Sequence, residues 1–324
     1  MDTKLITRRI IKEIEYAEAR IRKYIRTTEL EYSSYFSELS GVNVYFKLEN
    51  LQHTGSFKTR GAMNKLLSLT KKELESGIVS ASTGNHGLAV SYCLNKLNAS
   101  GIVFAPKNAL EDKVVAMKRQ GVEVKFYGND CAVAEAKARE YAIENNMVFI
   151  SPYNDMQVIA GQGTISNELQ NQLSKIDAVF ISLGGGGLIS GIAAQAKCVF
   201  PDVEIVGCSP ENSQVMIKSV KAGKILDIPS LPTLSDGTAG GVEPGSITFE
   251  FCKALVDQYI VVSEEDIKKY LFMFIQIHHM LIEGSAAVAI ASFIREKKKY
   301  SGKNVVILLC GANIGMDTLK KVLN

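Results

Sequence analysis

Apolar and polar residues follow two recurring patterns along the chain. Short apolar runs, such as 101–105 and 178–183, are typical of strands, while the stretches after them carry apolar residues at helical spacing. The predicted strands are 42–48, 77–81, 101–105, 122–127, 147–151, 178–183, 204–208 and 303–309. The predicted helices are 7–25, 59–69, 86–97, 112–120, 130–145, 158–173 and 188–200.

The alternation of strands and helices indicates a doubly wound α/β fold. The runs 204–208 and 303–309 are almost continuously apolar, as expected for parallel strands that helices cover on both faces. Because no obvious linker divides the chain, we expect two interleaved lobes with mainly parallel sheets. The large lobe is expected to comprise 1–68 and 150–324, and the small lobe 69–149.

A long apolar stretch occupies residues 270–290. The residues just before it, Ser-Glu-Glu-Asp at 263–266, resemble a capping box and predict that a long helix begins there. Polar residues interrupt the apolar stretch at Gln276, His278, His279 and Glu283. A membrane span requires roughly 20 mostly apolar residues, so the pattern favours a buried helix.

The composition excludes several classes of protein. The 324 residues are 46% hydrophobic and 22% charged, as in globular proteins and unlike disordered chains. A net charge of +3 gives no reason to expect nucleic acid or a membrane as the partner. The six cysteines show no CxxC spacing, which argues against a disulfide framework or a zinc site. Residues 1–26 hold no apolar stretch of signal-peptide length, so we expect a cytoplasmic protein.

Two polar loops precede predicted helices. In the first, Lys58 follows a Gly-Ser turn, where the positive helix end and Arg60 would lower its pKa and favour the neutral amine that imine chemistry needs. In the second, residues 80–87 gather hydroxyls, an amide and backbone N–H groups that suit a carboxylate. Taken alone, the first loop also fits a surface lysine and the second a simple helix cap.

Two further stretches follow apolar strands. Four consecutive glycines at 184–187 allow the backbone to approach a phosphate closely, while the absence of GxGxxG disfavours a dinucleotide. Cys310 ends the last apolar strand, where open α/β sheets bind ligands, although alone it would equally suit a buried apolar position. Glu283 places a carboxylate within an apolar region, and a buried carboxylate requires a partner.

Together these stretches resemble the pyridoxal-phosphate (PLP) enzymes of fold type II, the tryptophan-synthase β-like superfamily. Within that superfamily the chain is similar to the threonine/serine dehydratases and serine racemases. The matching segments, in the family's order, are 47–61, 82–87, 160–164, 184–187, 236–237, 283–284 and 310–313. The likeness extends over nearly the whole chain.

The resemblance implies a role for each matching residue. Lys58 would form the Schiff base with PLP and act as general base at Cα. The residues implied to bind the cofactor, mostly from the large lobe, are Lys58, Phe57, Asn85, Gly184, Gly185, Gly186, Gly187, Leu188, Glu283 and Cys310. The residues implied to bind the substrate carboxylate, all from the small lobe, are Ser82, Thr83, Asn85 and His86. Thr83 is in addition a catalytic candidate.

The activity that the resemblance implies is β-elimination of the hydroxyl of L-threonine or L-serine, which gives 2-oxobutanoate or pyruvate and ammonia. A thiol at Cys310 would be a weak partner of the pyridine nitrogen, which suits elimination better than transamination. A serine racemase stays open, because Thr83 retains the hydroxyl that racemases supply from serine. Residues 240–245 resemble those of dehydratases of hydroxyectoine breakdown, so 3-hydroxyaspartate or a hydroxyectoine-derived substrate also stays open. A non-catalytic ligand-binding protein is the alternative from another class.

The resemblance also bears on metals and assembly. Ser209 and Val215 stand where the cation-binding members of the family carry acidic residues, so no metal site is expected. Relatives are commonly dimers or tetramers, so a homodimer or homotetramer is expected.

Overall fold

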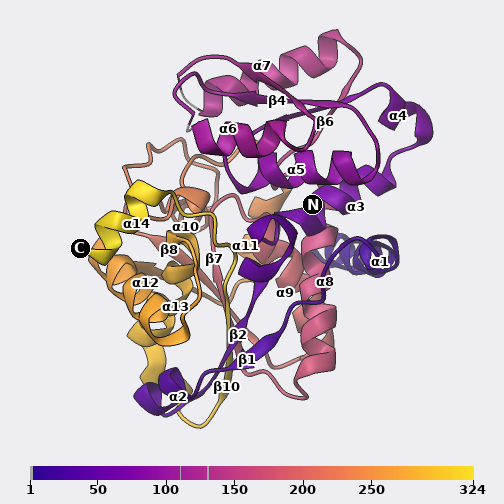
Figure 1. Cartoon of the computed structure of the whole chain (residues 1–324). Coiled ribbons are helices and arrows are strands. Elements are labelled where there is room, and N and C mark those ends of the chain that lie inside the picture. Colours follow the sequence, from indigo (N-terminus) through magenta and orange to yellow (C-terminus); the bar gives the residue numbers. More distant parts are fainter. Residues whose placement is uncertain (1–2, 110, 130) are drawn as a thin grey trace.

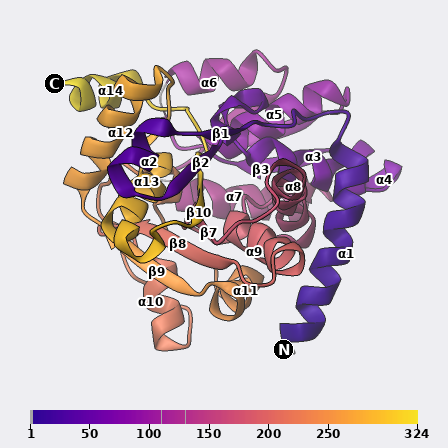
Figure 2. The same cartoon turned by 90° about the horizontal axis from the view of Figure 1, so that it is seen from below.

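The computed structural model describes residues 3–109, 111–129 and 131–324. Within these ranges ten strands form two sheets, which helices cover (Figures 1 and 2). The strands are β1 (Leu30–Tyr32), β2 (Asn43–Lys47), β3 (Ile78–Ala81), β4 (Gly101–Ala105), β5 (Glu123–Phe126), β6 (Val148–Phe149), β7 (Ala178–Ser182), β8 (Glu204–Pro210), β9 (Gln258–Val262) and β10 (Asn304–Leu308). Pairing is parallel throughout except between β1 and β2, which confirms the predicted α/β class with mainly parallel sheets.

The α-helices of the described ranges follow the strands in the expected alternation. They are α1 (Thr3–Ile21), α2 (Ser34–Ser40), α3 (Lys58–Ser68), α4 (Lys71–Glu75), α5 (Asn85–Lys96), α6 (Glu111–Lys118), α7 (Cys131–Glu144), α8 (Met156–Gln172), α9 (Gly187–Val199), α10 (Val215–Ala222), α11 (Ile247–Leu255), α12 (Glu264–His278), α13 (Gly284–Glu296) and α14 (Met316–Leu323). Most predicted bounds are met within a few residues. Asp130, at the start of one predicted helix, lies outside the described residues.

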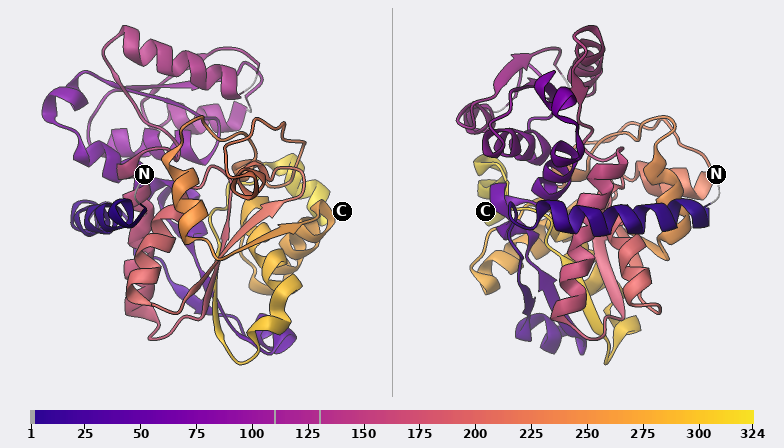
Figure 3. Two further views of the ribbon diagram at one scale, coloured as in Figure 1. Left: turned by 180° about the vertical axis from the view of Figure 1, so that it is seen from behind. Right: turned by 90° about the vertical axis from the view of Figure 1, so that its right-hand side faces the viewer.

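The large sheet has the order β1-β2-β10-β7-β8-β9. Its central strands β7 and β10 are almost wholly buried, as their continuous apolar sequences predict. Figure 3 shows why: α8, α9 and α1 lie on one side of this sheet, and α12 and α13 lie on the other. The last strand in sequence, β10, thus stands in the middle of the sheet between β2 and β7.

The small sheet has the order β5-β4-β3-β6. α7 packs on one face of this sheet, and α5 and α6 pack on the other (Figure 1). All its strands fall within the predicted small lobe, and α3 connects the lobes because it contacts both α5 and α8. The boundaries of the two lobes stay a prediction.

The single long helix predicted across 270–290 is wrong. α12 ends at His278 and α13 begins at Gly284. His279 has a φ of 52°, a left-handed conformation that ends the helix. Glu283 is the extended N-cap residue of α13, so its side chain is free to turn toward other segments. In the described part of the chain, no helix is long and apolar enough to cross a bilayer.

Candidate active site

Lys58 is the first residue of α3, and the end of β10 holds its segment in place. The N–H of Phe57 donates to the carbonyl of Cys310 at 3.1 Å. The Lys58 amine donates to the carbonyl of Pro152 at 2.8 Å. Loss of hydration lowers the pKa of Lys58 to about 8, although the nearby Cys310 and Glu283 oppose this effect. A lysine of this kind supplies the neutral amine that attacks a carbonyl carbon.

The glycine loop, Gly184 to Gly187, connects β7 to α9. Gly186 has a φ of 88° and is the N-cap of α9, and no side chain among the described residues caps that helix by a hydrogen bond. A Cβ at Gly185 would lie 2.6 Å from the ring of Tyr153. A Cβ at Gly184 would lie 2.8 Å from the carbonyl oxygen of Thr238. The backbone therefore lies so close to its neighbours that a side chain would not fit at these positions. The N-terminus of α9 carries a partial positive charge, and its free N–H groups can bind an anion.

The second polar loop connects β3 to α5. The Ser82 hydroxyl accepts a hydrogen bond from the N–H of Gly84 at 3.0 Å. His86 is buried, with Nε2 at 3.1 Å from the carbonyl of Ile150. Burial lowers the pKa of His86 to about 3, so its ring is neutral at physiological pH. The hydroxyls of Ser82 and Thr83 thus stand beside the positive end of α5, where a carboxylate is stabilised.

Asn85, Glu283 and Asn313 form a hydrogen-bonded group. The Asn85 amide donates to both carboxylate oxygens of Glu283, at 2.9 and 3.0 Å. The Asn313 amide donates to Oδ1 of Asn85 at 2.5 Å, and the Asn313 backbone N–H donates to Glu283 at 3.1 Å. These bonds fix which way the Asn85 amide faces. The break between α12 and α13 makes them possible, because it turns Glu283 toward the small lobe.

Glu283 and Cys310 are both buried groups whose charged forms are disfavoured. Burial raises the pKa of Glu283 to about 7, against the opposing effect of its bond to Asn85. Burial likewise raises the pKa of the Cys310 thiol well above its ordinary value. The Cys310 sulfur lies 4.0 Å from Glu283 Oε1. Cys310 is therefore a neutral thiol and a weak hydrogen-bonding partner.

One cavity of about 680 Å³ brings the predicted site residues together. The predicted residues that line it are Phe57, Lys58, Ser82, Thr83, Asn85, His86, Gly184, Gly185, Gly186, Gly187, Leu188, Glu283 and Cys310. Most of them lie in, or directly after, the loops that follow β3, β7 and β10, so the cavity lies at the carboxyl ends of these strands, as ligand sites of open α/β sheets do. The individual role of each residue stays a prediction.

The same cavity contains charged residues that the sequence does not single out as a group. They are Lys113, Glu135, Arg139, Asp236 and Glu243. Glu135 and Arg139 are four residues apart on α7, and from sequence alone such a spacing indicates an ordinary surface ion pair. Only the fold shows that this pair faces a cavity.

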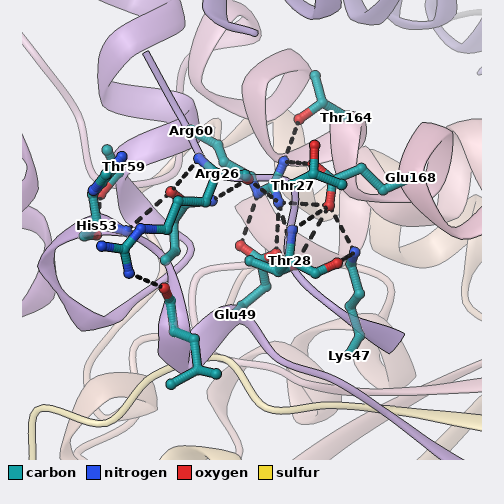
Figure 4. A network of polar contacts seen from close by, with 12 residues as sticks. Arg26, Thr27, Thr28, Lys47, Glu49, His53, Thr59, Arg60, Thr164 and Glu168 are labelled. Atoms are coloured by element: carbon teal, nitrogen blue, oxygen red, sulfur yellow. Dashed lines mark hydrogen bonds and ion pairs between the residues drawn. The ribbon is translucent and has the colours of Figure 1, made fainter. Parts of the chain in front are cut away.

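A buried ion cluster holds the first turn of α3 against the large lobe (Figure 4). Arg60 donates to Glu49 at 2.7 and 2.8 Å and to Glu168 at 2.7 and 3.0 Å. Lys47 donates to Glu168 at 2.7 Å. Burial alone would raise the pKa of Glu168, but Arg60 and Lys47 lower it below its ordinary value. The cluster fixes the position of Arg60, two residues after Lys58.

Comparison with known proteins identifies the family. A family model described as pyridoxal-phosphate dependent enzyme matches residues 21–311. The chain belongs to this family. It is 35% identical over 314 residues to an L-threonine ammonia-lyase of Thermotoga maritima, an alignment that covers 97% of this chain and 78% of the relative. It is 36% identical over 318 residues to the serine racemase of Dictyostelium discoideum, covering 97% and 98% of the two chains.

Solved structures agree with this assignment to the PLP-dependent family. The processed form of threonine deaminase isoform 2 from Solanum lycopersicum matches with a TM-score of 0.93 at 32% identity. The match covers 98% of this chain and 92% of the other chain. The likeness therefore includes both lobes and the cavity.

The residues of the cavity fit PLP. The glycine loop lies at a helix N-terminus as a phosphate requires, and it packs so closely on Thr238 and Tyr153 that a Cβ at Gly184 or Gly185 would clash with them. An amine with a lowered pKa, Lys58, lines the same cavity, as covalent capture of an aldehyde requires. Asn85 supplies an amide and Cys310 a thiol for the polar atoms of the ring.

Proposed function

We propose that this PLP-dependent enzyme is a dehydratase (ammonia-lyase) of L-threonine and L-serine, which yields 2-oxobutanoate or pyruvate and ammonia. The observation that carries the proposal is one cavity that contains a lysine of lowered pKa, an anion-binding glycine loop and a carboxylate-binding loop. Relatives named L-threonine ammonia-lyase, at 35% and 37% identity, support the reaction type. Loss of a β-hydroxyl requires the groups that this cavity holds: a base at Cα and a site for the α-carboxylate.

The residues proposed to hold the cofactor surround its three polar regions. The glycine loop and the N-terminus of α9 bind the phosphate, Asn85 contacts the ring hydroxyl, and Cys310 faces the pyridine nitrogen. Phe57 and Leu188 line the cavity with apolar surface beside the ring. When bound, PLP supplies the electron sink that stabilises negative charge at Cα.

The residues proposed to act on the substrate come from both lobes. Ser82 and Thr83, with the N-terminus of α5, bind the α-carboxylate, and the neutral His86 holds this loop through its bond to Ile150. Lys58 removes the proton from Cα. Glu283 orients Asn85, since it accepts both bonds of that amide.

The test combines spectroscopy with product assays. Purified protein supplied with PLP is expected to absorb in the visible range and to release ammonia and a 2-oxo acid from L-threonine and L-serine. Lys58→Ala is expected to lose both the bound-cofactor absorbance and turnover. Full activity in Lys58→Ala would refute the proposal.

Serine racemisation is the second candidate. Thr83 lines the cavity that also contains Lys58, and its hydroxyl is the proton donor that this candidate assigns to the second face of Cα. The 36% identity to a serine racemase agrees with this reading. Chiral analysis of serine after incubation separates the two activities, because a dehydratase consumes L-serine without accumulating D-serine.

We further propose a cytoplasmic homodimer or homotetramer with the lobe boundaries 68/69 and 149/150. Several exposed apolar side chains support self-association, among them Phe272 at 38% and Leu281 at 48% exposure. The buried thiols Cys93, Cys208 and Cys252 are unoxidised, as is usual in a reducing compartment. Light scattering after size-exclusion chromatography measures the assembly, and limited proteolysis maps the boundaries.

A further inference from the structure

Three charged side chains that are not among the predicted site residues line the same cavity. Arg139 Nη2 lies 2.7 Å from Glu135 Oε1 and 2.7 Å from Glu243 Oε1. Arg139 and Glu135 belong to α7 of the small sheet's lobe. Glu243 belongs to the loop between the 3-10 turn Asp236–Thr238 and α11, in the part of the chain that forms the large sheet. We call Glu135, Arg139 and Glu243 the acidic wall.

Further contacts hold Glu243 beside the glycine loop. Its second carboxylate oxygen accepts a bond from the Asn154 amide at 3.0 Å. Its backbone N–H donates to the Tyr153 hydroxyl at 2.9 Å, and the Tyr153 ring packs directly against Gly185. The acidic wall therefore has a defined place next to the proposed phosphate site.

Arg139 is held in place as well. Its guanidinium lies over the ring of Phe149, with 4.3 Å to the ring centroid. The side chain of Arg139 is 36% exposed, and those of Glu135 and Glu243 are each 25% exposed, so all three are only partly hydrated. Charges in such a partly dehydrated cleft interact more strongly than charges in water.

The acidic wall carries one negative charge in excess, because two carboxylates share one guanidinium. Two other charged residues that line the cavity, Lys113 and Asp236, lie 3.6 Å apart and balance each other. The charge of Glu135 also acts on Lys58. Burial lowers the pKa of Lys58, and Glu135 is among the groups that raise it.

The position of the acidic wall indicates which part of the substrate it meets. The proposed carboxylate loop, the glycine loop and the group around Asn85 account for the α-carboxylate and the cofactor. Much of the remaining lining of the cavity comes from α7 and the loop 239–243, with Lys113, Tyr153 and Asp236 beside them. This lining is left for the substituent on the β-carbon.

We propose that the acidic wall sets substrate selectivity by charge: it disfavours amino acids with a second carboxylate, such as 3-hydroxyaspartate, and admits neutral or cationic side chains. The inference rests on the proposed function for the identity of the reacting group. It is a case of selectivity by repulsion, because an anionic side chain meets unbalanced negative charge while an uncharged one does not.

The test measures ligand binding to the PLP-loaded protein by the absorbance change of the cofactor. Three amino acids that carry no β-hydroxyl serve as probes: L-aspartate, L-2-aminobutyrate and L-2,4-diaminobutyrate. L-Aspartate is expected to bind at least about 10-fold more weakly than L-2-aminobutyrate. Glu243→Gln is expected to reduce this difference, since it leaves Arg139 with a single carboxylate.

Arg139→Gln is expected to act in the opposite direction. It leaves two unopposed carboxylates, so it is expected to weaken the binding of L-aspartate further and to strengthen the binding of L-2,4-diaminobutyrate. Structural damage to the loop or to α7 would weaken the binding of all three ligands alike. The change in selectivity would then not have opposite signs in the two variants. Glu140→Gln is the matched control, because Glu140 lies on the same helix, is 57% exposed and pairs with Lys137 outside the cavity.

The outcomes separate this inference from the proposed function. Two results would overturn the proposed role of the acidic wall. One is that L-aspartate binds as tightly as L-2-aminobutyrate, and the other is that both variants shift the selectivity in the same direction. A different outcome is that L-aspartate binds more weakly than L-2-aminobutyrate while neither L-threonine nor L-serine is turned over. In that case the dehydratase proposal fails and the proposed role of the acidic wall is retained. Turnover of 3-hydroxyaspartate with the kcat/KM of L-threonine would also refute the acidic wall.

Discussion

Glu168→Gln perturbs the ion cluster that holds the first turn of α3. Glu168 is 3% exposed and accepts hydrogen bonds from Arg60, Lys47, Arg22 and the backbone of Thr28. Glutamine keeps the shape but removes the charge. Of the buried charges, Arg60 and Lys47 then face Glu49 alone, and one positive charge becomes unbalanced.

The expected loss of stability is several kcal/mol. Removing one partner of a buried ion pair costs about 3–5 kcal/mol, because the remaining charge stays buried. An unfolding entropy of about 2.1 cal/mol/K per residue over 324 residues gives roughly 0.7 kcal/mol/K. The variant should therefore unfold about 4–7 °C below the wild type.

Thermal unfolding followed by circular dichroism measures this difference. The control is Glu75→Gln, which removes a carboxylate from the exposed pair Lys71–Glu75, with side chains 89% and 65% exposed. The control should shift the midpoint by less than about 1 °C. A Glu168→Gln protein that unfolds as the control does would show that the cluster does not stabilise the fold.

Two further predictions concern the cavity. Gly185→Ala places a Cβ 2.6 Å from the Tyr153 ring. The variant should therefore lose PLP on dialysis, which the visible absorbance measures. A variant that retains all of its PLP would contradict the proposed role of the glycine loop. Glu283→Gln should remove a pH dependence of stability. Burial raises the pKa of Glu283 from 4.5 to about 7, so this side chain favours the folded state when protonated. That contribution, about 3 kcal/mol, is fully present below the unfolded pKa and is lost as pH rises through 7. If the melting temperatures of the wild type and of Glu283→Gln fall equally between pH 5 and 8.5, this contribution of Glu283 is refuted.

The alternation of strands and helices could be predicted because it depends on local periodicity. β4 was predicted with its observed bounds, and β7 and α9 within one residue, because each is a continuous run of one pattern. The break between α12 and α13 was missed because apolar residues continue on both sides of it. What ends α12 is the left-handed backbone at His279, a conformation that is uncommon for any residue other than glycine.

The candidate site divides in the same way. The glycine loop and the segment around Lys58 carry recognisable local sequences, and the fold brings them to one cavity. The acidic wall has no such signal. Its members Arg139 and Glu243 are separated by 104 positions, and their pairing arises only when α7 packs beside the loop that carries Glu243.

The placement of β10 has a consequence for how the protein forms. This strand begins 246 positions after Lys58 (304 minus 58), yet it fills the middle of the large sheet, and Cys310 just after it anchors Phe57. During synthesis the surroundings of the Lys58 amine therefore cannot form until β10 has been made. Such long-range closure is slow, and capture of the vitamin-derived aldehyde should follow the pairing of β10 within the large sheet.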